Sequence, residues 1–194
     1  MSLAEVFIIE SLSFENERNQ RDGYLLYQSL KMYNKKPKYY YIRTKKEFLK
    51  VMNFFQQSKY RYLHLSCHGS TAEVSLTLDS IAFKEFGIII SPFLDNRRLF
   101  VSSCELVNRS FAKQIFPVSR CYSIVGPSQK INFTTANISW MTFYHLMFGE
   151  DDNKMKDINI KKQVATINKT FNARFKYYKP SGKSKEGFAS VSLD

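Results

Sequence analysis

Two segments, RYLHLSCHGS (Arg61 to Ser70) and RRLFVSSCELVN (Arg97 to Asn108), decide the expected fold and point to a site. Each is a short apolar run that ends at a reactive side chain: His68, followed by Gly69, in the first, and Cys104 in the second. Sheets of parallel strands that alternate with helices bind ligands beyond the carboxyl ends of their strands. If these two strands are neighbours, about 4.8 Å apart, the imidazole and the thiol project into one crevice. A cysteine nucleophile and its base require this arrangement.

The remainder of the chain alternates short apolar runs with segments of helical period, which predicts a doubly wound α/β fold with a mainly parallel sheet. Thr44 and Glu47 have the spacing of a capping box at the start of one helix. The expected strands are 6–9, 38–42, 60–66, 74–78 (a small hairpin or edge strand), 99–103 and 121–125. The expected helices are 23–33, the segment after Thr44, 81–95, 109–115, 135–148 and 157–178. Residues 1–178 are therefore predicted to form a single domain, and 179–194 a mobile polar tail.

Composition narrows the class of protein. A chain of 194 residues with 44% hydrophobic residues can bury one sizeable core, so a single globular domain is expected. Its three cysteines form no disulfide framework, which favours a reducing, cytoplasmic location. The amino end lacks the pattern of a signal peptide, and no apolar run approaches the roughly 18 residues of a membrane-spanning helix.

The net charge of +12 favours acidic partners, which could be nucleic acid, anionic lipid or an acidic protein. The basic residues are scattered along the chain, however, as expected for the solvated faces of a basic protein. Aromatic residues do not interleave with basic ones on one strand face, so a nucleic-acid partner is not favoured. We expect no membrane partner.

Three motifs in order make the chain resemble the caspase-like cysteine peptidases, and among them the CHAT domains. YLHLSCHGS is similar to the strand of that family that ends in His-Gly, and LFVSSCELVN to its strand that ends in Ser/Ala-Cys. CYSIVGPSQKINFTTANISWMTFYHLMF is similar to its strand, turn and helix. The resemblance extends over roughly residues 3–178. The turn at 127–134 lacks the Trp-Pro pair common in CHAT domains. The resemblance implies a three-layer caspase-like sandwich around the sheet.

The resemblance also implies the chemistry of a cysteine endopeptidase that acts on a protein or peptide. Cys104 would attack the peptide carbonyl as its thiolate, and His68 would hold the thiolate and protonate the leaving amine. The backbone N–H groups of Gly69 and Cys104 would form the oxyanion hole, and glycine suits that position because it lets the backbone approach the substrate. Control would come from a regulatory protein partner or a conformational step.

The loop of residues 11–22 is expected to build the pocket for the residue before the cut, and its candidates are Glu15, Glu17, Arg18 and Arg21. An acidic pocket would favour Lys or Arg, and a basic one Asp or Glu; the sequence leaves this open. Four other residues are interpreted as structural: Cys67, Cys121, His64 and His145. We expect no cofactor. We also expect no metal, because Cys67, His68, Cys104 and Cys121 lack the paired ligand spacing of a zinc site.

An alternative from another class is a catalytically inactive caspase-like interaction module, with its basic faces as a potential surface for nucleic acid. Selective reaction of Cys104 with a peptide electrophile would distinguish the enzyme from this module. An affinity for nucleic acid that falls steeply as the salt concentration rises would identify such binding.

Overall fold

In the computed structural model, which describes residues 2–193, the chain winds helices around a nine-stranded mixed sheet. The main path of the sheet has the order β2-β1-β3-β6-β7-β8-β9, and β4 and β5 form a hairpin beside β3. The strands are β1 (Leu3–Ser11), β2 (Lys38–Tyr41), β3 (Tyr60–Gly69), β4 (Glu73–Ser75), β5 (Ser80–Ala82), β6 (Arg98–Ser102), β7 (Ser123–Pro127), β8 (Phe175–Pro180) and β9 (Phe188–Ser190). Strands β2, β1, β3, β6 and β7 are parallel to one another. Strand β8 pairs antiparallel with β7, and β9 pairs antiparallel with β8.

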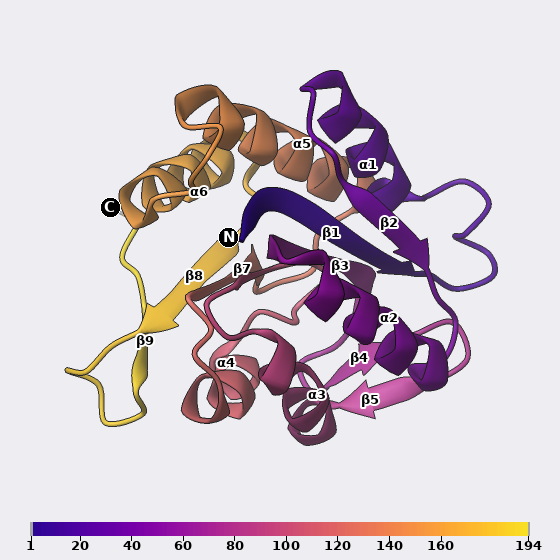
Figure 1. Cartoon of the computed structure of the whole chain (residues 1–194), viewed down its shortest axis with the longest axis horizontal. Coiled ribbons are helices and arrows are strands. Elements are labelled where there is room, and N and C mark those ends of the chain that lie inside the picture. The colour runs from indigo at the N-terminus through magenta and orange to yellow at the C-terminus, as the bar shows by residue number, and fades with distance from the viewer. Residues whose placement is uncertain (1, 194) are drawn as a thin grey trace.

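The helices form one layer on each face of this sheet, which confirms the predicted α/β class (Figure 1). They are α1 (Asp22–Met32), α2 (Lys45–Ser58), α3 (Phe83–Ile90), α4 (Arg109–Ile115), α5 (Phe133–Glu150) and α6 (Asp157–Phe171), with 3₁₀ turns at Ser91–Phe93 and Phe116–Val118. Helices α1, α5 and α6 cover one face, and α2, α3 and α4 the other (Figure 1). The layer of α1, α5 and α6 packs on the sheet around Trp140 and forms one hydrophobic core. The layer of α2, α3 and α4 forms a second core that includes Phe48 and Phe86.

Burial of the sheet on both faces explains why its inner strands have apolar residues at consecutive positions. Residues Val6 to Ile9 of β1 are all fully buried, as expected for a strand covered by helices on each side. Helix α2 begins as predicted: the Thr44 hydroxyl accepts the Glu47 amide, and the Glu47 carboxylate accepts the Thr44 amide. No helix within residues 2–193 is both long and apolar enough to cross a membrane.

The carboxyl-terminal region corrects two expectations. The predicted helix to residue 178 is wrong, because α6 ends at Phe171 and Asn172 has a positive φ of 52°. Asn168 then binds both the amide and the carbonyl of Phe175, which starts β8. Residues 179–193, expected as a mobile tail, instead contain the end of β8 and all of β9. The antiparallel addition of β8 to β7 buries Tyr177, so this segment gains more as a strand than as a helix.

Candidate active site

The register between β3 and β6 brings His68 and Cys104 to one edge of the sheet. Ser66 pairs with Ser102 in this parallel ladder, and His68 and Cys104 each lie two residues further along. His68 is still on β3 and therefore shares the face of Ser66, whereas Cys104 lies in the turn that follows the end of β6 at Ser102. The imidazole and the thiol line one small cavity of about 30 Å³, together with Ile131, Phe133 and Ala136 at and before the start of α5.

The His68 ring is held by contacts on two sides. Its Nε2 lies 2.8 Å from Nδ2 of Asn16, and its edge meets the Phe133 ring at a centroid distance of 5.7 Å. Since an amide nitrogen only donates, Nε2 accepts and the proton of the neutral ring is on Nδ1. Burial lowers the pKa of His68, and the negative charge of Asp22 opposes that shift. The neutral imidazole is therefore the main form at neutral pH.

Cys104 lies on the turn that follows β6. The following residue, Glu105, has a positive φ of 59°, and its amide donates to the Gln129 carbonyl at 3.2 Å. The Cys104 thiol donates to the Ile131 carbonyl at 3.2 Å. Among residues 2–193 the Cys104 amide donates no hydrogen bond, and none joins the thiol to His68. An unpaired amide beside a half-buried thiol is what an oxyanion site at this position would need.

Gly69 follows His68 at a point where the backbone is too crowded for a side chain. A Cβ there would lie 2.5 Å from both the Ser103 hydroxyl oxygen and a methyl carbon of Leu106. Glycine is thus required by close packing against the turn that carries Cys104. The contact fixes the two strand ends relative to each other.

Beneath the thiol and the imidazole lies a carboxyl group that the sequence analysis did not select. Asp22, the first residue of α1, lines the same cavity and is only 7% exposed. Its two carboxylate oxygens accept the hydroxyls of Ser66 and Ser102, at 2.6 and 2.7 Å. Ser66 of β3 and Ser102 of β6 therefore each donate a hydrogen bond to a different oxygen of the same carboxylate.

Asp22 shares its buried position with Glu10 of β1. The Glu10 carboxyl accepts the Gly23 amide at 2.8 Å and the Tyr39 hydroxyl at 2.6 Å. Burial, followed by the charge of Asp22, raises the pKa of Glu10 to about 7. Burial also raises the pKa of Asp22, against the hydrogen bonds from its serines. Two neighbouring buried carboxyls cannot both ionise readily, so we assign the pair one proton and one negative charge near neutral pH.

A buried hydroxyl completes the cavity wall. The Ser103 hydroxyl is 4% exposed as a residue and makes no hydrogen bond within the described part of the chain, although it lies near the Cys67 sulfur. A buried hydroxyl without a partner is unusual, since most such groups are hydrogen-bonded. The cavity therefore offers both a negative charge and an unused polar atom.

The four expected pocket residues lie away from this cavity. Glu17 binds the Arg43 guanidinium at 2.8 Å and the Tyr41 hydroxyl at 2.9 Å. Arg21 donates to the Glu17 carbonyl and stacks on Tyr41. Glu17, Arg18 and Arg21 line a separate shallow hollow of about 510 Å³, and Glu15 is exposed. Their part in binding a substrate stays a prediction.

The other cysteines and the buried histidine are structural, as predicted. Cys67 and Cys121 are buried, which raises the pKa of each thiol to about 12. His64 lies under Trp140 and contacts the Tyr144 hydroxyl at 3.2 Å, and burial lowers its pKa to about 3. His145 is on the exposed side of α5, where its ring contacts the Tyr33 ring at a centroid distance of 5.1 Å and a tilt of 43°.

Comparison with known proteins identifies the fold but no sequence relative. Solved structures with the same architecture include caspase-1 from Spodoptera frugiperda, with a TM-score of 0.53 over 86% of this chain and 78% of that chain. The fold is caspase-like. No family model matches the sequence, and no curated protein is significantly similar to it. At 12% identity the likeness to caspase-1 extends to the fold alone.

Proposed function

We propose that this chain is a cysteine endopeptidase of the caspase-like, CHAT-domain type, with Cys104 as nucleophile and His68 as its acid and base. One observation carries the proposal. A thiol and an imidazole follow equivalent positions of two adjacent parallel strands and line one cavity on a caspase-like sheet. Ligands bind at this end of the strands in open α/β sheets.

In the proposed reaction His68 exchanges its hydrogen bond with Asn16 for one with Cys104, and the freed Nε2 takes the proton of the thiol. The sulfur then attacks the carbonyl carbon of the scissile peptide. The resulting oxyanion accepts hydrogen bonds from the amides of Gly69 and Cys104; the latter has no other acceptor among the described residues. The carbon–nitrogen bond then breaks as His68 donates its proton to the leaving amine. Water hydrolyses the thioester, which releases the acid and restores the thiol.

The resting site is narrow, so entry of a substrate side chain requires movement. A cavity of about 30 Å³ holds about two water molecules and cannot admit a long side chain. The Cys104 thiol is also bound to the Ile131 carbonyl, which lies in the turn before α5. Displacement of this turn would release the thiol and widen the cavity, consistent with control by a partner or a conformational step.

The carboxyl pair supports a preference for Lys or Arg before the cut. Asp22 supplies a buried negative charge beside the thiol, and the Ser103 hydroxyl supplies an unused polar atom. A buried charge without a counter-ion is unfavourable, so a substrate ammonium or guanidinium that reaches Asp22 would bind strongly. An acidic side chain would be repelled.

Turnover of fluorogenic peptides with Lys, Arg, Asp or Ala before the reporter group tests both parts of the proposal. The wild-type protein should prefer Lys or Arg over Asp, and Cys104→Ala and His68→Ala should abolish turnover. Asp22→Asn should reduce kcat/KM for the basic peptides at least about tenfold more than for the Ala peptide, since it removes the charge but keeps the shape. Asp95→Asn, which removes the charge of an acid that pairs with Arg120 and does not line this cavity, is the matched control and should leave the ratio unchanged.

A preference for Asp, or an equal loss of selectivity in Asp95→Asn, would contradict the role of Asp22. Turnover that persists in Cys104→Ala would contradict the peptidase itself. The thermal midpoint of each variant shows whether it is folded, so a loss of activity through unfolding is recognised.

The alternative is an inactive interaction module on the same fold. It is supported by the missing hydrogen bond between Cys104 and His68 and by the narrowness of the cavity. Such a module would show no turnover with any peptide, and its three thiols would react according to exposure alone.

A further inference from the structure

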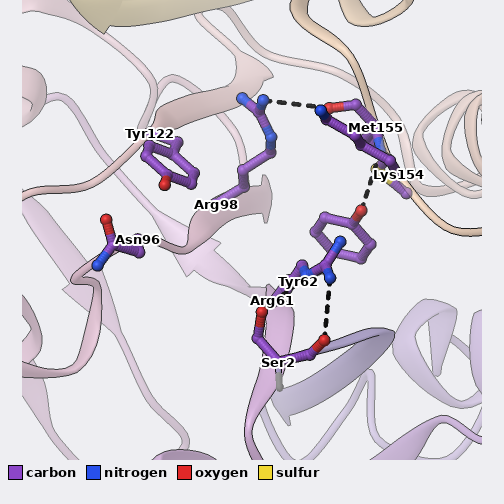
Figure 2. Close-up of a pocket in the computed structure, with 8 residues that line it drawn as sticks. All are labelled: Ser2, Arg61, Tyr62, Asn96, Arg98, Tyr122, Lys154 and Met155. Atoms are coloured by element: carbon purple, nitrogen blue, oxygen red, sulfur yellow. Dashed lines mark hydrogen bonds between the residues drawn. The ribbon is translucent and has the colours of Figure 1, made fainter.

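A second site lies at the opposite end of the two strands that carry His68 and Cys104. A hollow of about 250 Å³ is lined at the beginnings of β3 and β6 by Arg61, Tyr62 and Arg98, and beyond them by Tyr122 and Lys154 (Figure 2). Tyr62 pairs with Arg98 in the ladder and precedes His68 by six residues, so the hollow is about 20 Å from the proposed active site. It shares no residue with the Cys104 cavity.

The hollow has a strong excess of positive charge. It continues into a neighbouring hollow of about 590 Å³, with which it shares Arg98, Tyr122 and Lys154. The two are lined by five cations and one carboxylate: Arg61, Arg98, Lys154, Lys156 and Lys179, with Asp157. Such clustering of one sign in a concave surface attracts anions.

The single acid does not neutralise this charge. Asp157 binds Arg98 at 2.7 Å and Lys179 at 3.7 Å, and Lys156 pairs with Asp151 outside the hollow. Within residues 2–193, neither Arg61 nor Lys154 contacts a carboxylate. Arg61 and Lys154 face one hollow without counter-ions, so an anion that binds there would interact favourably with both charges.

Both guanidinium groups are held in place and still have donors to offer. Arg61 donates to the Ser2 hydroxyl and carbonyl and to the Asn153 carbonyl, each at 2.9 Å. Arg98 donates to the Met155 carbonyl at 3.1 Å (Figure 2). It also donates to the Ser123 hydroxyl at 2.9 Å and to the Asp157 carboxylate. Each guanidinium has five N–H groups, so two remain on each for a ligand. Preorganised arginine forks of this kind suit phosphate oxygens.

The loop that carries Lys154 is fixed as well. The Asp151 carboxylate accepts the amides of Asn153 and Lys154, at 3.0 and 3.1 Å. The Tyr62 hydroxyl accepts the Met155 amide at 3.0 Å (Figure 2). The Lys154 side chain is exposed beside this anchored backbone, so its ammonium can reach a ligand while the loop keeps its shape.

Tyr122 adds an aromatic surface to the cations. Its ring is 49% exposed and lies 5.6 Å from the Arg98 guanidinium carbon. An exposed aromatic ring beside a basic groove is the combination on which nucleobases stack while their phosphates are neutralised. A simple anion such as phosphate has no base to stack on this ring, so the ring would add nothing to its binding.

From this arrangement we infer that the hollow binds the phosphate groups of a nucleotide or of a short single-stranded nucleic acid, with a base stacked on Tyr122. The inference is independent of the proposed peptidase activity. It also gives the basic charge of this chain one defined location rather than a diffuse surface.

Binding by the full chain of a fluorescein-labelled ten-thymidine DNA, ATP and inorganic tripolyphosphate tests the inference. Arg61→Gln/Lys154→Gln should weaken binding of the DNA and of ATP at least about tenfold at low salt. It should also reduce the slope of log affinity against log salt by about 1.4 for the DNA, since each neutralised phosphate contributes about 0.7. Tyr122→Ala should weaken DNA and ATP binding at least about fivefold but leave tripolyphosphate unaffected.

Lys46→Gln/Lys50→Gln, on the exposed face of α2, removes the same charge elsewhere and is the matched control. An equal loss of affinity in this control would overturn the inference in favour of diffuse attraction. Absence of binding at low salt would also overturn it, as would tripolyphosphate binding as tightly as ATP with no effect of Tyr122→Ala. Thermal midpoints identify any variant that is unfolded, and Lys154→Gln alone, at an exposed position, provides a second test.

Discussion

At the scale of single residues, the carboxyl pair Glu10 and Asp22 is the feature with the clearest energetic consequence. Both acids are buried, and each accepts two hydrogen bonds from neutral donors rather than from a cation. A pair of this kind resists full ionisation. Asp22 lines the same cavity as the proposed catalytic groups, so a cationic substrate would offset the unfavourable burial of its negative charge.

The raised pKa of Glu10 predicts a pH-dependent stability. The unfolded carboxyl titrates at 4.5 and the folded one at about 7, so its contribution is present below pH 4.5 and is lost as the pH rises through 7. Glu10→Gln mimics the protonated form and should be more stable than the wild type above pH 7, by up to about 3 kcal/mol.

Urea unfolding between pH 4.5 and 8 measures this difference, with Glu15→Gln, at an exposed position, as the control. The two variants should behave alike at pH 4.5 and diverge as the pH rises. If Glu10→Gln were less stable than the wild type at pH 8, the assignment of a shared proton would be incorrect.

The residues of the site could be predicted only in part from the sequence. His68 and Cys104 stand out because each ends an apolar run. Their approach depends on the pairing of β3 with β6, which the sequence analysis assumed and the structure contains. Asp22 was one of several charged residues in a loop, and the sequence does not reveal which of them turns inward. Asn16 was equally hidden. A usable signal was present in Ser66 and Ser102, which precede His68 and Cys104 at equal distances on two buried strands and need a shared acceptor.

At the scale of elements, the ends of β6 and β7 and the turn after β6 are in close contact. Gly126 of β7 faces the Val101 carbonyl, and a Cβ at this position would lie 2.3 Å from that oxygen and 2.8 Å from a Val107 methyl carbon. Val107 follows Cys104 on the same turn and donates its amide to Pro127. The close approach of β7 to β6 thus supports the turn that carries the thiol.

Gly126→Ala should therefore destabilise the protein by about 1–3 kcal/mol through overpacking. Gly149→Ala is the control, because it lies in α5 with no atom within 4 Å of the added Cβ and should stabilise the helix slightly. Thermal or urea unfolding of the two variants gives the comparison. Equal stability of both would show that β6 and β7 can separate without cost, against the close packing described above.

The elements themselves were predictable wherever local pattern and tertiary packing agree. The Thr44 capping box and the strands that hold His64 and Val101 are of this kind. The segment after Phe171 was not, because its strand exists only through pairing with β7 at the far end of the sheet. Positive φ at Asn172 and Arg174 is the local mark of the break, and asparagine at a helix end is a recognised stop signal that could have indicated it.

At the scale of the whole molecule, β3 and β6 connect two sites of opposite character. Their carboxyl ends carry the thiol, the imidazole and the acidic cavity, and their amino ends carry the basic hollow. The caspase-like sheet therefore has one end suited to a cationic side chain and another suited to phosphate. Each assignment can fail without the other, since one is measured by turnover and the other by binding.

The central claim is that Cys104 is a nucleophile activated by His68, and covalent labelling tests it most directly. The protein is incubated with a peptidyl acyloxymethyl ketone that has Lys before the electrophile, and the labelled cysteine is located by peptide mass spectrometry. We predict that Cys104 is labelled in preference to Cys67 and Cys121, that an Asp probe labels more slowly, and that His68→Ala suppresses the labelling. Labelling of Cys104 that is unchanged in His68→Ala and no faster with Lys than with Asp would contradict the account.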